Sequence, residues 1–194
     1  MRLLLTSAGV RNESLKNALT GMAGKDIRMA FVPTAANVEE GSKGWLIDNL
    51  VELRKVGDVD VVDISALPKK IWKLRLGKAN VLVFSGGNTF HLMYWLNKSG
   101  LSSVLPGMLK TRVYVGISAG SMVTNPSISF SQSKVLYYEN LKVKRDMKAL
   151  GFVDFFIRPH LNSPDFPTVR IPLLEKQDDL LPRINSGVSS TGRA

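Results

Sequence analysis

One short segment carries the clearest chemical signature in the sequence. Gly116-Ile117-Ser118-Ala119-Gly120 matches the pattern G-x-S-x-G and follows an apolar run that is typical of a strand. In a nucleophile elbow the serine stands on a tight strand-to-helix turn, and the glycines leave room for neighbouring backbone. The turn places the serine at a helix N-terminus, so the amide of Ala119 can donate to an oxyanion. The segment predicts Ser118 as a nucleophile; the alternative is a glycine-rich turn whose serine only caps the helix.

A second loop, Gly86-Gly87-Asn88, also lies between an apolar run and a helical stretch. Paired glycines let the backbone approach a ligand closely and point amides at it. We expect the Gly87 amide to be a second oxyanion donor and Asn88 to contact the substrate. The alternative is an ordinary turn in which Asn88 caps the helix.

A serine nucleophile needs a base, and the chain has two histidines. His91 lies in the first turn of the helix after Gly87, whereas His160 follows a strand-like run over residues 153–159. We therefore expect His160 to be the base. A third group should orient the imidazole, but no carboxylate has a spacing that singles it out. The candidates for this group are Asp146, Asp154, Asp165 and Glu139.

These loops require a scaffold, and apolar runs that alternate with helical stretches supply one. The alternation predicts an α/β three-layer sandwich with a mostly parallel central sheet. Ligands bind beyond the carboxyl ends of such strands, where Ser7-Ala8-Gly9 forms a third loop of interest. The expected strands are Arg2–Thr6, Arg28–Pro33, Val59–Ile64, Ala79–Phe84 and Thr111–Ile117. The expected helices span residues 12–20, 39–55 and 89–97.

Composition limits the function classes. The 194 residues are enough for one domain with a single substantial core. The absence of cysteine excludes disulfides, thiolate metal sites and a cysteine nucleophile. The N-terminal apolar run is too short for a signal peptide, and no stretch approaches the roughly 18 apolar residues that span a bilayer. We therefore expect a cytoplasmic protein with no membrane partner, no metal and no other cofactor.

The formal net charge of +10 raises the prior for acidic partners, including nucleic acid. The lysines and arginines are scattered, however, and lack the interleaved aromatic residues of a base-stacking surface. A solvated basic face that helps to attract acidic substrates is the favoured interpretation, and nucleic-acid binding is the weaker one.

Three segments taken together resemble the peptidase E family of aspartyl dipeptidases. They are residues 84–90, 116–120 and 158–162, and the resemblance covers roughly residues 1–172 in the same order. The family is related to cyanophycinase and has a class I glutamine amidotransferase-like fold. The combination is far more specific than any one of its motifs.

The resemblance implies a site and an activity. Ser118 would be the nucleophile and His160 the base, while the amides of Gly87 and Ala119 would stabilise the oxyanion. The reaction would be cleavage of a small peptide next to aspartate, without a metal. Arg170 would bind the carboxylate of the substrate; a helix-surface arginine is the alternative.

The sequence departs from the family in two places. Some members have an aspartate between the serine and the histidine, where this chain reads Ser131-Gln132-Ser133-Lys134. Others place an acid in a final strand and turn, whereas residues 176–194 are polar and lack an apolar strand. We expect one domain over residues 1–175, an atypical polar tail over 176–194 and a truncated C-terminal part of the fold. A second copy could cover the exposed sheet edge as a homodimer.

Three functions from different classes follow. The leading one is a serine peptidase that hydrolyses small acidic peptides through an acyl-enzyme. The second is a catalytically impaired relative that binds a ligand or partner without turnover, because no triad acid is identifiable. The third is nucleic-acid binding through the positive charge.

Overall fold

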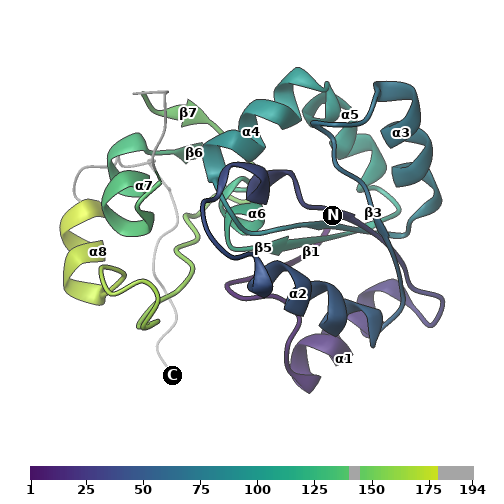
Figure 1. The fold of residues 1–194 in the computed structure, drawn as a ribbon, viewed down its shortest axis with the longest axis horizontal. Helices are drawn as coiled ribbons and strands as arrows, with labels where there is room; N and C mark the ends of the chain where they lie inside the picture. The colour runs from purple at the N-terminus through teal and green to yellow at the C-terminus, as the bar shows by residue number, and fades with distance from the viewer. Residues whose placement is uncertain (140–144, 179–194) are drawn as a thin grey trace, which may run out of the picture.

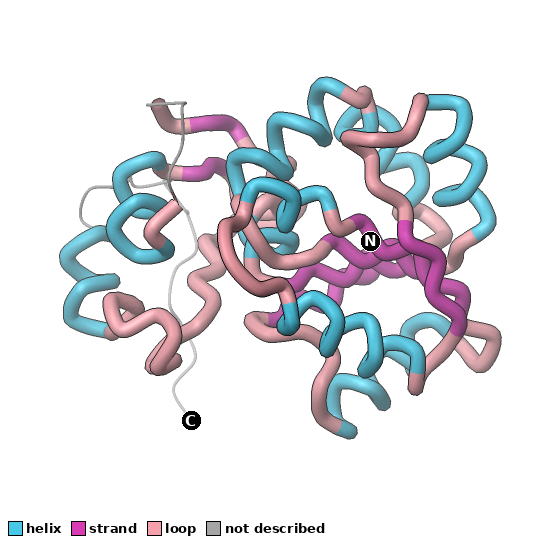
Figure 2. Tube along the Cα trace, in the orientation of Figure 1, coloured by secondary structure: helices cyan, strands magenta, loops and turns pink. Residues whose placement is uncertain are grey.

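A parallel β-sheet forms the centre of the computed structural model, which describes residues 1–139 and 145–178 (Figures 1 and 2). The sheet has five strands in the order β1-β5-β4-β2-β3, and every neighbouring pair is parallel. The expected strands are therefore confirmed, with small shifts at their ends. The strands are β1 (Arg2–Thr6), β2 (Arg28–Val32), β3 (Asp58–Val61), β4 (Val81–Phe84) and β5 (Val113–Ile117).

Helices cover both faces of the sheet, because side chains alternate between two apolar cores. Leu82 and Phe84 of β4 pack in one core with α3, α4 and α5, and Val81 and Val83 pack in the other with α1 and α2. Figure 1 shows the two helical layers on opposite sides of the sheet. The helices are α1 (Glu13–Ala23), α2 (Gly44–Arg54), α3 (Lys69–Lys78), α4 (Thr89–Lys98) and α5 (Leu101–Met108). This arrangement is the expected α/β sandwich.

The chain beyond β5 forms a smaller group of elements next to the sheet (Figure 1). It begins with the one-turn helix α6 (Ala119–Met122) and includes a short antiparallel pair of strands. The other elements are β6 (Ser127–Ile128), α7 (Phe130–Tyr137), β7 (Met147–Lys148) and α8 (Ile171–Asp178). The loop between β7 and α8 carries His160, so this group brings the expected base to the end of the sheet.

Three expectations about single elements change. The helix expected over residues 39–55 begins only at Gly44, and a 3-10 helix, η1 (Thr34–Val38), precedes it. The run over 153–159 is not a strand. Instead the side chain of Asn125 takes the place of a neighbouring strand, since its Oδ1 accepts from the Ile157 amide at 3.0 Å. Four helices, α3, α5, α7 and α8, were not expected.

The expected domain boundary falls inside α8, which runs to Asp178. Most of the expected polar tail, residues 179–194, lies outside the described residues. Within residues 1–139 and 145–178, no helix is both long and apolar enough to cross a bilayer.

Candidate active site

Ser118 stands on a strained turn at the carboxyl end of β5. Its φ of 49° and ψ of −107° lie in a region that non-glycine residues rarely occupy. The turn is held in place because the Ser118 amide donates to the carbonyl oxygen of Thr6 on β1 at 2.9 Å. A Cβ on Gly120 would lie 2.1 Å from the carbonyl oxygen of Phe84, so only glycine fits there. This is the geometry of a nucleophile elbow.

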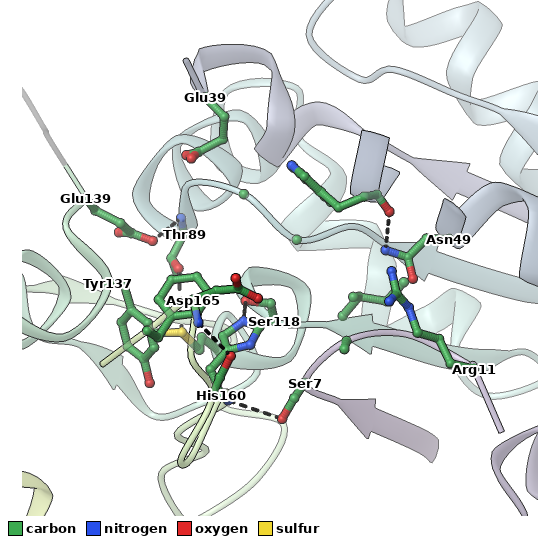
Figure 3. A pocket seen from close by; sticks show the side chains of 18 residues that line it. Ser7, Arg11, Glu39, Asn49, Thr89, Ser118, Tyr137, Glu139, His160 and Asp165 are labelled. Carbon is green, nitrogen blue, oxygen red and sulfur yellow. Dashed lines mark hydrogen bonds between the residues drawn. The ribbon is translucent and has the colours of Figure 1, made fainter. Parts of the chain in front are cut away.

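The imidazole of His160 lies next to this serine, although the two residues belong to different parts of the chain. Ser118 Oγ is 2.8 Å from His160 Nε2 (Figure 3). The backbone amide of His160 donates to Ser7 Oγ at 3.3 Å, at the end of β1. Its ring stacks on Phe166 with 4.1 Å between the centroids. The backbone of His160 is therefore held at the end of β1, and its ring is held by Phe166 with one nitrogen at the serine.

The environment of His160 suits a base. Burial lowers the pKa of the imidazole, and the negative charge of Asp165 offsets part of this effect. A histidine with a lowered pKa is neutral at pH 7 and can accept the proton of Ser118.

Two backbone amides are available for an oxyanion. Ala119 is the first residue of α6, so its amide has no acceptor within the helix. The amide of Gly87 donates to no acceptor among the described residues. Gly87 has a φ of 122°, and a Cβ there would lie 2.4 Å from the carbonyl oxygen of Ala35. A Cβ on Gly86 would come within 3.3 Å of Ser118 Cβ, so this loop lies against Ser118.

Ser118 and His160 line a pocket of about 380 Å³. Figure 3 shows Glu39 and Glu139 at one end of the pocket and Arg11 at the other, with Ser118 between the ends. Sequence reasoning did not place Arg11 or Glu39 here, and it considered Glu139 only as a partner for the histidine. One signal was available, since Arg11 comes shortly after the strand end at Ser7-Ala8-Gly9.

Two residues that we expected to contact the substrate do not line this pocket. Asn88 is buried, and its Oδ1 accepts from the His91 amide at 2.9 Å, so it caps α4. The guanidinium of Arg170 donates to backbone carbonyls in its own loop, among them that of Val169 at 3.0 Å. Both side chains thus support the loops around the pocket, and Arg11 is the arginine that borders it.

The four candidates for the third catalytic group have different surroundings. Glu139 Oε1 accepts from the Thr89 amide and Asp146 Oδ1 from the Phe130 amide, each at 2.8 Å. Asp154 is exposed. Asp165 lines the pocket, and its charge acts on His160.

No hydrogen bond between described residues involves Nδ1 of His160. Of the four carboxylates, Asp165 is the one whose charge raises the pKa of the imidazole. Within residues 1–139 and 145–178, no group of three or more His, Cys, Asp or Glu side chains is placed to hold a metal ion.

Relatives with similar sequences are peptidases by name. An uncharacterised peptidase of Pasteurella multocida (strain Pm70) is 29% identical over 160 residues, which cover 79% of this chain and 74% of the relative. Peptidase E of Streptomyces coelicolor is 28% identical over 175 residues, which cover 85% of this chain and 66% of the relative.

Solved structures share the fold. A Listeria monocytogenes EGD-e protein named as a candidate peptidase E superposes with a TM-score of 0.73 at 24% identity, over 90% of this chain and 86% of that one. A peptidase from an acI-B1 actinobacterium gives a TM-score of 0.63 at 18% identity, over 84% and 69%. The model of peptidase family S51 matches residues 3–184. The chain therefore belongs to peptidase family S51 and is a hydrolase of the peptidase class.

Proposed function

We propose that this peptidase hydrolyses small acidic peptides, such as aspartyl dipeptides, through an acyl-enzyme on Ser118. The observation that carries the proposal is the 2.8 Å contact between Ser118 Oγ and His160 Nε2 at a strained elbow. His160 takes the proton of the hydroxyl while Oγ attacks the scissile carbonyl. The amides of Gly87 and Ala119 stabilise the oxyanion.

The remaining steps, loss of the leaving amine and hydrolysis of the ester, use the same groups. The imidazolium of His160 gives its proton to the leaving amine, and the acyl group stays on Ser118. A water molecule, deprotonated by the neutral imidazole, then attacks the ester. The imidazolium returns this proton to Ser118 Oγ as the bond to the acyl group breaks and the acid is released. No step needs a group other than water and the residues described above.

The preference for acidic peptides is supported by Arg11. It lines the pocket, and it forms no ion pair with any described residue. A guanidinium can bind a carboxylate through two parallel hydrogen bonds. A pocket of about 380 Å³ is also near the small end of the usual range for ligand sites, which suits a short peptide.

Replacing the nucleophile tests the mechanism. We expect Ser118→Ala to lower kcat for Asp-Leu hydrolysis at least about a thousandfold, because no other group can form the ester. Ser103→Ala, on an exposed part of α5, is the matched control and should retain full activity. Unchanged turnover in Ser118→Ala would refute the assignment. Binding of Asp-Leu without turnover by the unaltered protein would favour a ligand-binding module instead.

Replacing Arg11 tests the substrate class. We expect Arg11→Gln to raise KM for Asp-Leu about tenfold with little change in kcat, because a charged contact to the substrate is lost. Arg54→Gln on the exposed face of α2 removes the same charge outside the pocket and should leave KM unchanged. Equal KM values for both variants would show that Arg11 does not bind the substrate.

A further inference from the structure

Glu139 has a buried carboxyl group that the proposed mechanism does not use. The residue is 7% exposed and lines the same pocket as Ser118. One oxygen, Oε1, accepts from the Thr89 amide at 2.8 Å. The other, Oε2, has no hydrogen-bond partner among the described residues. A buried carboxylate oxygen without a partner costs free energy, so a ligand that donates a hydrogen bond to Oε2 would be stabilised there.

A second carboxyl group lies at the same end of the pocket. Glu39 also lines the pocket, and Figure 3 shows it beside Glu139. Neither glutamate belongs to an ion pair between described residues. Burial, the hydrogen bonds to Thr89 and the charge of Glu39 set the pKa of Glu139, and burial dominates by raising it to about 7. A bound cation would offset both the free-energy cost of burying the charge and the repulsion between the carboxylates.

The pocket therefore has two ends of opposite charge. The glutamates occupy one end, Arg11 the other, and Ser118 lies between them (Figure 3). A short peptide with a free N-terminus carries an ammonium group and at least one carboxylate, which match these ends. The outer torsion of a glutamate side chain is soft. A small rotation can therefore turn Oε2 toward a ligand while Oε1 stays within hydrogen-bonding distance of the Thr89 amide.

We propose that Glu139 and Glu39 form the subsite that binds the free ammonium group of the substrate, with Glu139 as the main specificity-determining residue. This subsite rests on the proposed function, since it lies in the pocket of the proposed nucleophile. It makes the protein a peptidase for unblocked N-termini. An ammonium group suits this site as a ligand because the two carboxylates, when ionised, offer acceptors only.

Binding measurements separate this subsite from the chemistry. In the Ser118→Ala background, which cannot turn over the ligand, the affinities for Asp-Leu and N-acetyl-Asp-Leu are measured by calorimetry. We expect the unblocked peptide to bind at least about tenfold more tightly, as for a charge-assisted hydrogen bond. Adding Glu139→Gln should remove most of this preference. The amide oxygen of glutamine can still accept from Thr89, so the local structure is kept.

Glu40→Gln is the matched control, because Glu40 is exposed and does not line the pocket. It should keep the preference for the unblocked peptide. A preference that survives Glu139→Gln, or that is absent before any substitution, overturns the subsite. Failure of both peptides to bind overturns it as well.

Proton release provides a readout that a purely structural role would not change. A carboxyl group with a pKa of about 7 is half protonated at pH 7, so an ammonium ion should displace about half a proton from it. Calorimetry of Asp-Leu binding in buffers of different ionisation enthalpy should show this release. The two proteins compared are Ser118→Ala and Ser118→Ala with Glu139→Gln. The other ionisable groups that line the pocket are Glu39, Arg11, Tyr137, Asp165 and His160. The charges of Lys43 and Glu40 also act on Glu39, and both proteins retain all of these groups. Equal release in both proteins, or net uptake that depends on Glu139, contradicts the proposal.

The outcomes also distinguish the two proposals. A Glu139-dependent preference in a protein that hydrolyses nothing would support the subsite and refute the hydrolytic mechanism. Hydrolysis that depends on Ser118 but ignores N-acetylation would do the reverse.

Discussion

His160 is buried enough to disfavour its charged form, and this sets the pH range of the proposed reaction. The base must be neutral to accept the proton of Ser118, so activity is lost as the pH falls through the pKa of the imidazole. Burial lowers that pKa. We therefore expect the acid limb of kcat/KM for Asp-Leu to have its midpoint below 6.5, the usual value for histidine. A midpoint at or above 6.5 would contradict this view of the site.

Asp165 affects the pKa of the His160 imidazole. Its negative charge raises the pKa of His160 and stabilises the imidazolium. Asp165→Asn should move the acid limb to lower pH still and lower kcat/KM by roughly tenfold, less than the loss of about four orders of magnitude for a hydrogen-bonded triad acid. Asp154→Asn, at an exposed position, is the control and should leave the profile unchanged. A larger loss in Asp165→Asn, near that of a triad acid, would mean that Asp165 orients the imidazole directly during turnover.

The elbow between β5 and α6 depends on close backbone contact. A Cβ at Gly120 would lie 2.1 Å from the Phe84 carbonyl oxygen, whereas a Cβ at Gly77 in α3 would meet nothing within 4 Å. We expect Gly120→Ala to lower the free energy of unfolding by about 2 kcal/mol or more, since backbone must move. Gly77→Ala should raise it by about 0.5–1 kcal/mol, because alanine favours a helix. Thermal unfolding of both variants checks the contrast, and similar Tm values would contradict it.

The elements that the sequence predicts well are those with local signatures. The apolar runs of the sheet and the glycines around Ser118 can be recognised within a few residues of sequence. Local pattern failed where a distant partner decides the structure. The run over 153–159 has strand-like composition, yet no strand among the described residues pairs with it, and the side chain of Asn125 hydrogen-bonds to the amide and the carbonyl of Ile157.

The same distinction applies to the pocket. The sequence left two roles open for Asn88, contact with the substrate or a cap on the helix, and the structure shows the cap, since its Oδ1 accepts from the His91 amide. The resemblance to peptidase E suggested Arg170, whereas the arginine at the pocket comes from the loop after β1. Arg11, Glu39 and Glu139 line one pocket because segments far apart in the sequence converge there. Of the three, only Arg11 has a local signal, its position shortly after the strand end at Ser7-Ala8-Gly9.

The charge of the whole molecule and that of the pocket have opposite signs. The chain has a net charge of +10, yet Glu39, Glu139 and Asp165 line the pocket with Arg11 as its charged counterpart. A positive exterior attracts acidic peptides over long range, and this field weakens with salt. The carboxylates act at short range, where they can orient an ammonium group. The two scales therefore favour the same class of ligand, a short peptide that carries both charges.

The buried carboxyl of Glu139 should also make global stability depend on pH. Its pKa is raised from 4.5 to about 7 on folding, so the folded protein holds this proton more tightly than the unfolded chain. Its contribution to stability is complete below pH 4.5 and is lost as the pH rises through 7. Glu139→Gln removes the buried charge and keeps an acceptor for Thr89. We expect its Tm to exceed that of the unaltered protein by about 2–4 °C at pH 8, the shift that 1 kcal/mol produces in a chain of this size.

At pH 5 the two proteins should unfold at nearly the same temperature, because the folded state then holds Glu139 in its neutral form. Glu40→Gln controls for the loss of one negative charge from a basic protein and should not reproduce the pH dependence. Equal Tm differences at pH 5 and pH 8 would mean that the carboxyl of Glu139 does not change its protonation over this range. An ammonium ligand should reduce the difference at pH 8, since it stabilises the carboxylate that the substitution removes.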